Sequence, residues 1–302
     1  MFTFPSFDDL KDLINLAKRE DLGPDGDDAT SRLLAPENAV GVGTLTQRQV
    51  GIVCGLPIVE MICRLYDERL RVEQIPGFHL EIIEGRFSDA RTTPLLRVRG
   101  PLRSLLSAER VILNFLQRLS GVATLTQRFV RKVQGTNARI YDTRKTTPGM
   151  RLLEKYAVRC GGGLNHRTGL YDAVLIKDNH LAEIPLKDLA NFLSSVVQRS
   201  RAEAAQRFIE VEVDTIDQLQ EALKPDGIDA ILLDNMDCPT MTHAVELRDR
   251  AGKKGRLSLE ASGGVTLETI RAIALTGVDR ISVGAITHSA PALDIGMDLE
   301  YS

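Results

Sequence analysis

Four acidic residues stand in short apolar runs, where charged side chains are unusual. Side chains alternate along a strand, so Glu210 and Glu212 of FIEVEV share one face, and Ile209, Val211 and Val213 share the other. Asp234 in AILLDN and Glu260 in LSLEAS occupy comparable positions. Buried carboxylates are rare unless they are paired or bind a cation. Two interpretations stay open: a salt-bridge network, or a Mg²⁺ site that takes one or two carboxylates plus substrate oxygens.

Basic residues are concentrated in one segment of an otherwise acidic chain. Between Arg139 and Lys177 there are eight Lys or Arg residues against three Asp or Glu residues, whereas the whole chain has a net charge of −3. This excess favours an anionic small-molecule ligand, with a solvated helix face as the alternative. Arg144 and Lys177 are also the candidate salt-bridge partners of the carboxylates.

The same segment contains a glycine-rich loop, CGGGLNHR, at 160–167. An isolated histidine such as His166 is more often structural than catalytic. Beside Arg167 and after three glycines, we interpret it as a ligand contact, because Arg binds carboxylate or phosphate through paired N–H bonds.

Two glycine-containing turns follow the last two apolar runs. Ser262, Gly263 and Gly264 precede the helical segment TLETIRAIA, and Gly284 lies in VGA at 283–285. Successive turns of this kind are typical of the phosphate site of an α/β barrel, where backbone N–H groups hold the anion. Simple tight turns are the alternative.

Several other functions are not indicated. GxSxG, HExxH and a Rossmann fingerprint are absent, and the net charge gives no basic field for nucleic acid. The four cysteines form no CxxC pair, which favours reduced thiols. The N-terminus does not resemble a secretory signal, and no apolar stretch approaches the roughly 18 residues of a membrane span. We therefore expect a cytoplasmic protein that binds neither membrane nor nucleic acid.

The elements that would position these residues change in character along the chain. A helix at 6–20, strands near 40–47, 78–85 and 94–100, and a helix at 57–68 predict an α+β sandwich. A helical stretch follows to about 133, with Gly121 as the expected joint between two helices.

After it, a strand-then-helix pattern recurs, with six strands at ARIYDT, DAVLIKDN, FIEVEV, DAILLDN, LSLEAS and RISVGA. Polar groups at the ends of so many strands favour an incomplete parallel α/β barrel of about six strands over a doubly wound sheet. The expected domains are 1–112 (sandwich), 113–285 (barrel) and a segment at 286–302 that packs back on the N-terminal domain.

The segment DTRKTTPGMRLLEKYAVRCGGGLNHRTGLYDAVLIKDNH at 142–180 closely resembles the signature region of quinolinate phosphoribosyltransferases. The resemblance continues in AERVILNFLQRLSG, EVEV, LLDNM, EASGGV and VGAITHSAPALDIGMD, and covers most of residues 105–298. The first 100 residues resemble the family only loosely, through EDLG and the order of elements.

The resemblance implies transfer of a phosphoribosyl group from phosphoribosyl pyrophosphate to quinolinate. The products would be nicotinate mononucleotide, pyrophosphate and CO₂, in NAD biosynthesis and with Mg²⁺. It also implies a homodimer, possibly a higher oligomer, in which Arg110 completes the quinolinate pocket of a neighbouring subunit.

Matched by motif, the resemblance assigns residues to each ligand. Quinolinate would be bound by Arg110, Thr143, Arg144, His166, Arg167 and Lys177. The catalytic group would be Lys145, Lys177, Glu212 and Asp234, of which Glu212 and Asp234 would hold the metal. Phosphate would be bound by Lys145, Ser262, Gly263, Gly264, Gly284 and His288.

Three alternative functions fit these residues less well. A molybdenum-transport-associated relative need not retain every cation of the quinolinate set. A nicotinate phosphoribosyltransferase handles a single carboxylate. A non-catalytic metabolite-binding scaffold would not require charged groups at every strand end.

Overall fold

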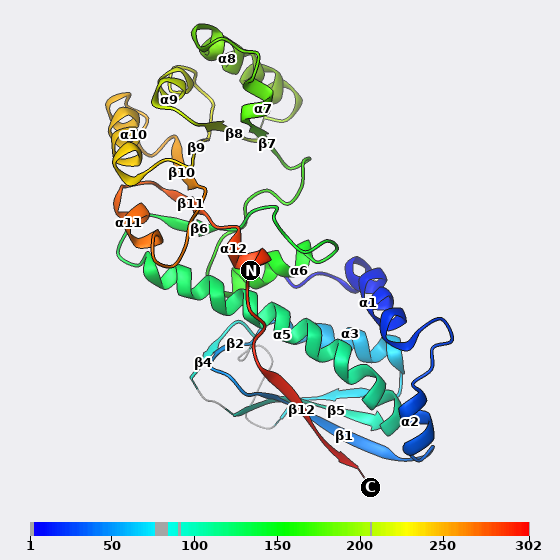
Figure 1. Ribbon diagram of the computed structural model, residues 1–302. Helices are drawn as coiled ribbons and strands as arrows, with labels where there is room; N and C mark the ends of the chain where they lie inside the picture. The colour runs from blue at the N-terminus through cyan, green and yellow to red at the C-terminus, as the bar shows by residue number, and fades with distance from the viewer. Residues whose placement is uncertain (1–2, 76–83, 90–91, 206, 302) are drawn as a thin grey trace. The chain divides into compact units, whose positions relative to one another are not determined.

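The chain divides into two units, each built from separate stretches of sequence (Figure 1). The computed structural model describes residues 3–75, 84–89, 92–205 and 207–301. Unit 1 comprises Met1–Gln127, Thr146–Gly162 and Ser289–Ser302, and unit 2 comprises Arg128–Lys145 and Gly163–His288.

Unit 1 is built around an antiparallel sheet with the strand order β12-β1-β5-β3. These strands are β1 (Val40–Gln47), β3 (Arg71–Glu73), β5 (Thr93–Pro101) and β12 (Ile295–Tyr301). The central strand β1 pairs with both neighbours, so that Thr44 lies opposite Arg97 on β5 and opposite Asp298 on β12. The C-terminal strand is therefore an integral part of the N-terminal sheet.

Short helices and a separate β-ribbon complete unit 1. They are α1 (Phe7–Leu22), α2 (Ala29–Leu34), α3 (Pro57–Tyr66), α6 (Arg151–Cys160), and the ribbon of β2 (Gly51–Ile52) with β4 (Phe87–Ser88). Ser6 begins α1 with a capping box, in which its hydroxyl accepts from the Asp9 N–H and the Asp9 carboxylate accepts from the Ser6 N–H. The expected α+β sandwich is confirmed, but most of the strand expected near 78–85 lies outside the described residues.

The long helix α5 (Leu102–Lys132) corrects one expectation. Gly121 does not separate two helices, because α5 continues through it without a break. A Cβ atom at this position would lie 2.0 Å from the carbonyl oxygen of Pro291. Glycine is thus required for close approach of the returning C-terminal segment and does not mark a joint.

Unit 2 is a six-stranded parallel sheet with the order β6-β11-β10-β9-β8-β7. Its strands are β6 (Arg139–Tyr141), β7 (Ala173–Ile176), β8 (Phe208–Val213), β9 (Ala230–Asp234), β10 (Ser258–Ser262) and β11 (Arg280–Ser282). Its helices are α7 (Asp178–Leu181), α8 (Leu186–Glu203), α9 (Ile216–Ala222), α10 (Cys238–Arg250), α11 (Ile270–Leu275) and α12 (Ala285–His288).

The first two strands of unit 2, β6 and β7, form the two edges of its sheet, so the barrel is open between them. The expected incomplete α/β barrel of about six strands is confirmed. Along β8, Ile209, Val211 and Val213 are fully buried, and Glu210 on the opposite face is only 1% exposed. Burial of both faces is typical of a parallel strand covered by helices on its outer side.

The boundaries between units differ from those expected. Residue 112 falls inside α5, and residues 146–162, expected in the barrel, belong to unit 1. At the C-terminus, the residues from Ser289 onward belong to unit 1, and β12 pairs with β1. None of the described helices is both long and apolar enough to cross a membrane.

Candidate active site

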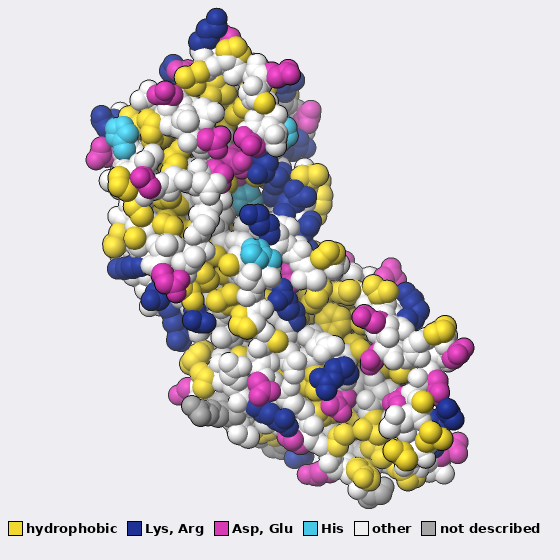
Figure 2. Space-filling view, in the orientation of Figure 1, with side chains coloured by type: hydrophobic (Ala, Val, Ile, Leu, Met, Phe, Trp, Pro, Cys, Tyr) yellow, Lys and Arg dark blue, Asp and Glu magenta, His cyan; other side chains and the backbone are white. Residues whose placement is uncertain are grey.

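Unit 2 contains a cleft of about 570 Å³ that is lined by polar residues from strand ends and their following loops. Figure 2 shows Lys, Arg and His side chains gathered beside Asp and Glu side chains on this unit. The lining residues are Thr143, Arg144, Lys145, His166, Arg167, Leu175, Lys177, Glu212, Leu232, Asp234, Asn235, Ser262, Gly263, Gly264 and Ser282. Carboxyl ends of strands are where α/β barrels build their catalytic sites.

A smaller cavity of about 250 Å³ shares part of this lining. Gly284 and His288 line it together with Thr143, Lys145, Ser262, Gly263 and Gly264. The two spaces together bring every predicted site residue except Arg110 into one region of unit 2. Arg110 lies on the exposed surface of α5 in unit 1 and makes no hydrogen bond or ion pair with the residues that the structure describes.

Two carboxylates, expected to bind metal, line the cleft. Glu212 is 8% exposed and pairs with the Lys177 ammonium at 2.8 Å. Asp234 accepts a hydrogen bond of 2.7 Å from the side chain of Asn235. The salt-bridge interpretation thus holds for Lys177, whereas Arg144 makes no ion pair within the described part of the chain. Neither pairing uses all the carboxylate oxygens, so both groups retain capacity to bind a cation.

Asn235 lines the cleft, although the sequence indicated it only as a polar residue at a strand end and predicted no role for it. It has a φ of 51°, the only non-glycine residue in the left-handed region among those described. The facing Gly263 also has a positive φ of 94°, and a Cβ there would lie 2.0 Å from Asn235 Oδ1. Glycine is therefore required at position 263, both because φ is positive there and because a side chain would clash with Asn235.

The backbone of Lys145 is held in place by two hydrogen bonds. The Lys145 N–H donates to Thr143 Oγ1 at 3.0 Å, and the Lys145 carbonyl accepts from Thr287 Oγ1 at 2.8 Å. A Cβ on Gly284 would lie 3.2 Å from both Lys145 Cδ and His288 Nε2. The absence of a side chain at Gly284 leaves room for Lys145 and His288 to converge on the smaller cavity.

The loop that carries His166 is attached to the edge strand β6. Leu164 forms a parallel bridge with Tyr141. The buried Asp142 accepts 2.7 and 2.8 Å hydrogen bonds from the Asn165 side chain and the His166 N–H, respectively. Asp142 was expected only as part of a strand end, and its complete burial shows that it organises this loop instead of facing a ligand.

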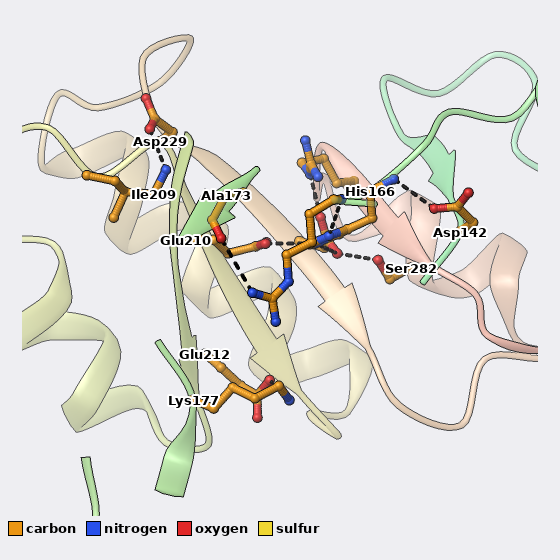
Figure 3. A network of polar contacts seen from close by, with 12 residues as sticks. Asp142, His166, Ala173, Lys177, Ile209, Glu210, Glu212, Asp229 and Ser282 are labelled. Atoms are coloured by element: carbon orange, nitrogen blue, oxygen red, sulfur yellow. Dashed lines mark hydrogen bonds and ion pairs between the residues drawn. The ribbon is translucent and has the colours of Figure 1, made fainter. Parts of the chain in front are cut away.

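His166 contacts protein groups through both ring nitrogens. Figure 3 shows Glu210 pointing toward His166, whose Nε2 lies 2.7 Å from a Glu210 oxygen. Nδ1 accepts the Arg167 N–H at 2.8 Å, so Nε2 carries the proton in this arrangement. The ring lines the cleft, but neither nitrogen is free for a direct hydrogen bond to a ligand.

Glu210 and Glu260 occupy the interior of the barrel. They are 1% and 0% exposed, and Glu260 pairs with Arg280 and accepts from Ser282. Sequence reasoning gave Arg280 no role, although an arginine opening the apolar strand RISVGA is the kind of signal that indicates a buried partner.

Charges within the interior group shift several pKa values. Burial and the neighbouring Glu210 raise the pKa of Glu260. For His166, burial acts to lower the pKa, but the hydrogen bond to Glu210 and the charge of Glu260 outweigh it, so the pKa is raised. Burial and the adjacent Arg144 lower the pKa of Arg167, because burial and a neighbouring positive charge both disfavour the charged guanidinium.

Comparison with known proteins gives a consistent result for both units. The model of the quinolinate phosphoribosyl transferase N-terminal domain matches residues 28–120, and that of the C-terminal domain matches residues 122–298. A nicotinate-nucleotide pyrophosphorylase (carboxylating) from Mycobacterium leprae is 40% identical over 293 residues, covering 97% of this chain and 98% of that protein. A probable enzyme of the same name from Bacillus subtilis is 39% identical, covering 97% of this chain and 94% of that protein.

Solved structures show the same similarity in three dimensions. The crystal structure of nicotinate-nucleotide pyrophosphorylase from Ehrlichia chaffeensis matches with a TM-score of 0.83 and 38% identity, covering 99% of this chain and all of that one. NadC from Streptococcus pyogenes matches with a TM-score of 0.85 and 33% identity, also over 99% of this chain and all of that one. A human nicotinic acid phosphoribosyltransferase, at 13% identity and a TM-score of 0.61, shares the fold.

Proposed function

The chain belongs to the quinolinate phosphoribosyl transferase family, and from that premise we propose a reaction for its cleft. The phosphoribosyl group of phosphoribosyl pyrophosphate is transferred to quinolinate with loss of one carboxylate. The products are nicotinate mononucleotide, pyrophosphate and CO₂, in NAD biosynthesis. The observation that carries this proposal is the convergence of cations, two carboxylates and glycine turns on one cleft of unit 2.

Quinolinate carries two carboxylates, and the cleft offers a matching group of cations. Arg144, Arg167 and Lys177 line it together with Thr143. Guanidinium groups bind planar carboxylates through paired N–H bonds, and an ammonium group supplies a compact charge. His166 supports this group indirectly, because its Nδ1 holds the Arg167 backbone.

The phosphoribosyl donor would occupy the part of the cleft that continues into the smaller cavity. Lys145 and His288 line that cavity beside the turns at Ser262–Gly264 and Gly284. Backbone N–H groups at such turns, together with a lysine, suit the 5′-phosphate. Glu212 and Asp234 lie in the larger cleft, where the ribose and pyrophosphate would meet the pyridine ring.

The donor atoms of Glu212 and Asp234 fit Mg²⁺, which prefers oxygen ligands. Among the described residues, the two clusters of three potential ligands are Cys54–Glu84–Cys160 and His166–Glu210–Glu260, and neither includes these carboxylates. The described residues thus do not enclose these two carboxylates in a closed ligand cage, and substrate oxygens would complete the coordination. When bound, the metal would neutralise charge on the pyrophosphate.

The remaining chemistry needs positioning and charge but no nucleophilic side chain. The pyridine nitrogen attacks C1 of the ribose as the bond to pyrophosphate breaks, and Lys145 and Lys177 stabilise the anionic groups electrostatically. The carbon–carboxylate bond next to the ring nitrogen then breaks, its electron pair passes to the pyridinium ring, and a proton replaces CO₂. A cleft of cations and carboxylates suits this reaction.

A direct assay tests the proposal. The purified protein should release CO₂ from carboxyl-labelled quinolinate only when phosphoribosyl pyrophosphate and Mg²⁺ are both present, with nicotinate mononucleotide formed in equal amount. Omission of each component provides the control. Absence of CO₂ release under all conditions from a folded protein would contradict the proposal.

Two further proposals concern assembly and location. The chain would act as a homodimer, possibly within a higher oligomer, with Arg110 entering the cleft of the partner subunit; support comes from its exposed position on α5. A cytoplasmic location is compatible with four free cysteines, because thiols stay reduced there.

A further inference from the structure

A buried ion pair lies in the barrel interior, one layer below the cleft. Arg280, the first residue of β11, donates through Nε to Glu260 on the neighbouring strand β10, where the two residues are register partners. Ser282 donates to the other oxygen of the same carboxylate. The Glu260 side chain is 0% exposed and that of Arg280 is 13% exposed. Such a pair is costly to break, because removal of one partner leaves the other charge buried.

The orientation of Arg280 is fixed by aromatic contacts as well as by charge. Its guanidinium lies 3.8 Å from the ring centroid of Tyr141 on β6 and 5.1 Å from that of Phe208 on β8. A planar guanidinium can stack on a ring and pair with a carboxylate at the same time, which a lysine ammonium does less well. Arg280 thus contacts residues of three strands of the barrel, namely β6, β8 and β10.

The ion pair reaches the cleft through His166. Glu260 Oε1 lies 3.6 Å from His166 Nε2, which is already bonded to Glu210 at 2.7 Å. On the other side of the ring, Nδ1 accepts the Arg167 N–H at 2.8 Å. Glu210 and Glu260 therefore both face Nε2 of His166. Arg280 neutralises Glu260, the carboxylate that is not hydrogen-bonded to this nitrogen.

We infer that Arg280 is a positioning residue for the dicarboxylate substrate, acting through Glu260 to hold the His166 ring and the Arg167 backbone in place. Without Arg280, the uncompensated Glu260 carboxylate attracts the Nε2–H of His166, whose Nε2 lies 3.6 Å away, and the ring turns from Glu210 toward Glu260. This rotation breaks the bond from the Arg167 N–H and displaces a guanidinium that lines the cleft. The inference rests on the proposed binding of quinolinate by Arg167.

The charges around His166 give the inference a second, independent readout. The charged groups that act on the ring are Glu210 on β8, Glu260 on β10 and Arg280 on β11, whereas Asp142 after β6 bonds the backbone N–H of His166. Burial lowers the pKa of His166, Glu260 raises it, and Arg280 lowers it. Loss of Arg280 should consequently raise this pKa, and loss of the Glu260 charge should lower it.

The kinetic test compares Arg280→Met, Arg280→Lys and the control Arg139→Met. Arg139 is the register partner of Arg280 on β6, but it is exposed. We expect Arg280→Met to raise the KM for quinolinate about tenfold or more, by analogy with the loss of residues that orient metal ligands. The KM for phosphoribosyl pyrophosphate should change much less. Arg280→Lys should recover part of the loss, and Arg139→Met should behave as the parent protein.

The structural test follows the titration of His166 by NMR in protein labelled at its five histidines, with His166→Gln to assign the signal. The pKa of His166 should rise in Arg280→Met and fall in Glu260→Gln, a pair of opposite signs that a packing defect would not produce. If Arg280→Met does not fold, Glu260→Gln serves alone, with a raised quinolinate KM and a lowered pKa expected. Unchanged KM and unchanged titration in a folded variant would overturn the inference. A parent protein without activity would contradict the proposed function, while the titrations would still test the network.

Discussion

At the scale of single residues, Lys177 stands between the two substrates that the cleft is proposed to bind. It lines the space beside Arg167, and its ammonium pairs with Glu212 at 2.8 Å. A cation in this position can contact a carboxylate of the acceptor, while Glu212 links it to the donor side. In the proposed reaction the pair would couple the placement of the two reactants, so both members would be needed for a productive geometry.

The metal requirement is the first prediction at this scale. Asp234→Asn removes the charge of one proposed ligand and should lower kcat/KM about a hundredfold, because an electrostatic contact to the leaving group is lost. It should also raise the Mg²⁺ concentration that gives half-maximal activity. Asp226→Asn is the matched control, since Asp226 is an exposed acid of the same unit that pairs with Lys253. Full activity of the parent enzyme in excess chelator would contradict the metal proposal.

Selectivity for two carboxylates is the second prediction. Nicotinate lacks one carboxylate, so it would leave part of the group formed by Arg144, Arg167 and Lys177 without a partner. Unpaired polar groups in a binding site can give selectivity of roughly 10⁴-fold or more. We expect kcat/KM for quinolinate to exceed that for nicotinate by about this factor, as measured with both acceptors under the same conditions. Comparable turnover of the two acids would show that the cations serve another purpose.

At the scale of elements, the sequence predicted the positions of strands better than the roles of side chains within them. The apolar runs ending in Glu212, Asp234 and Ser262 correspond to β8, β9 and β10, and all three residues line the cleft. Strand ends can be predicted because an apolar run followed by polar or glycine residues is a local pattern.

The interior network could not be predicted in the same way. Glu210 and Glu260 look like Glu212 in sequence, yet they face the barrel interior and bind His166 and Arg280. Which carboxylate reaches the cleft depends on its height along the strand and on partners from other strands. Gly121 shows the same limit, since only the fold reveals that Pro291 lies against it.

The third prediction concerns this helix. By helix propensity alone, Gly121→Ala should stabilise α5 by about 1 kcal/mol. The added Cβ would lie 2.0 Å from the Pro291 carbonyl oxygen, and such overpacking typically costs about 1–3 kcal/mol, with more where backbone must move. We therefore expect a lower Tm in thermal unfolding. Arg128→Ala, on an exposed position of the same helix, should change the Tm little. A higher Tm for Gly121→Ala would mean that the C-terminal segment does not pack against α5.

At the scale of the whole molecule, the residues proposed for the chemistry and the residue proposed to act across a dimer interface belong to different units. Unit 2 supplies all the residues that line the cleft, whereas Arg110 belongs to unit 1. The C-terminal strand β12 also belongs to unit 1, where it pairs with β1. Two-fold dimers are the commonest assembly of identical subunits.

The last prediction tests whether subunits share active sites. Arg110→Ala and Lys177→Ala proteins should each be nearly inactive when alone, since each lacks one proposed quinolinate contact. After random re-association, half of the dimers are hybrids. If Arg110 acts across the interface, each hybrid contains one intact site and one site with both substitutions, and the mixture should recover about a quarter of parental activity. If Arg110 acts within its own subunit, every site in a hybrid stays damaged. Lack of recovery despite demonstrated subunit exchange would therefore contradict sharing, and recovery without exchange, checked with differently tagged subunits, would point to contamination by parent enzyme.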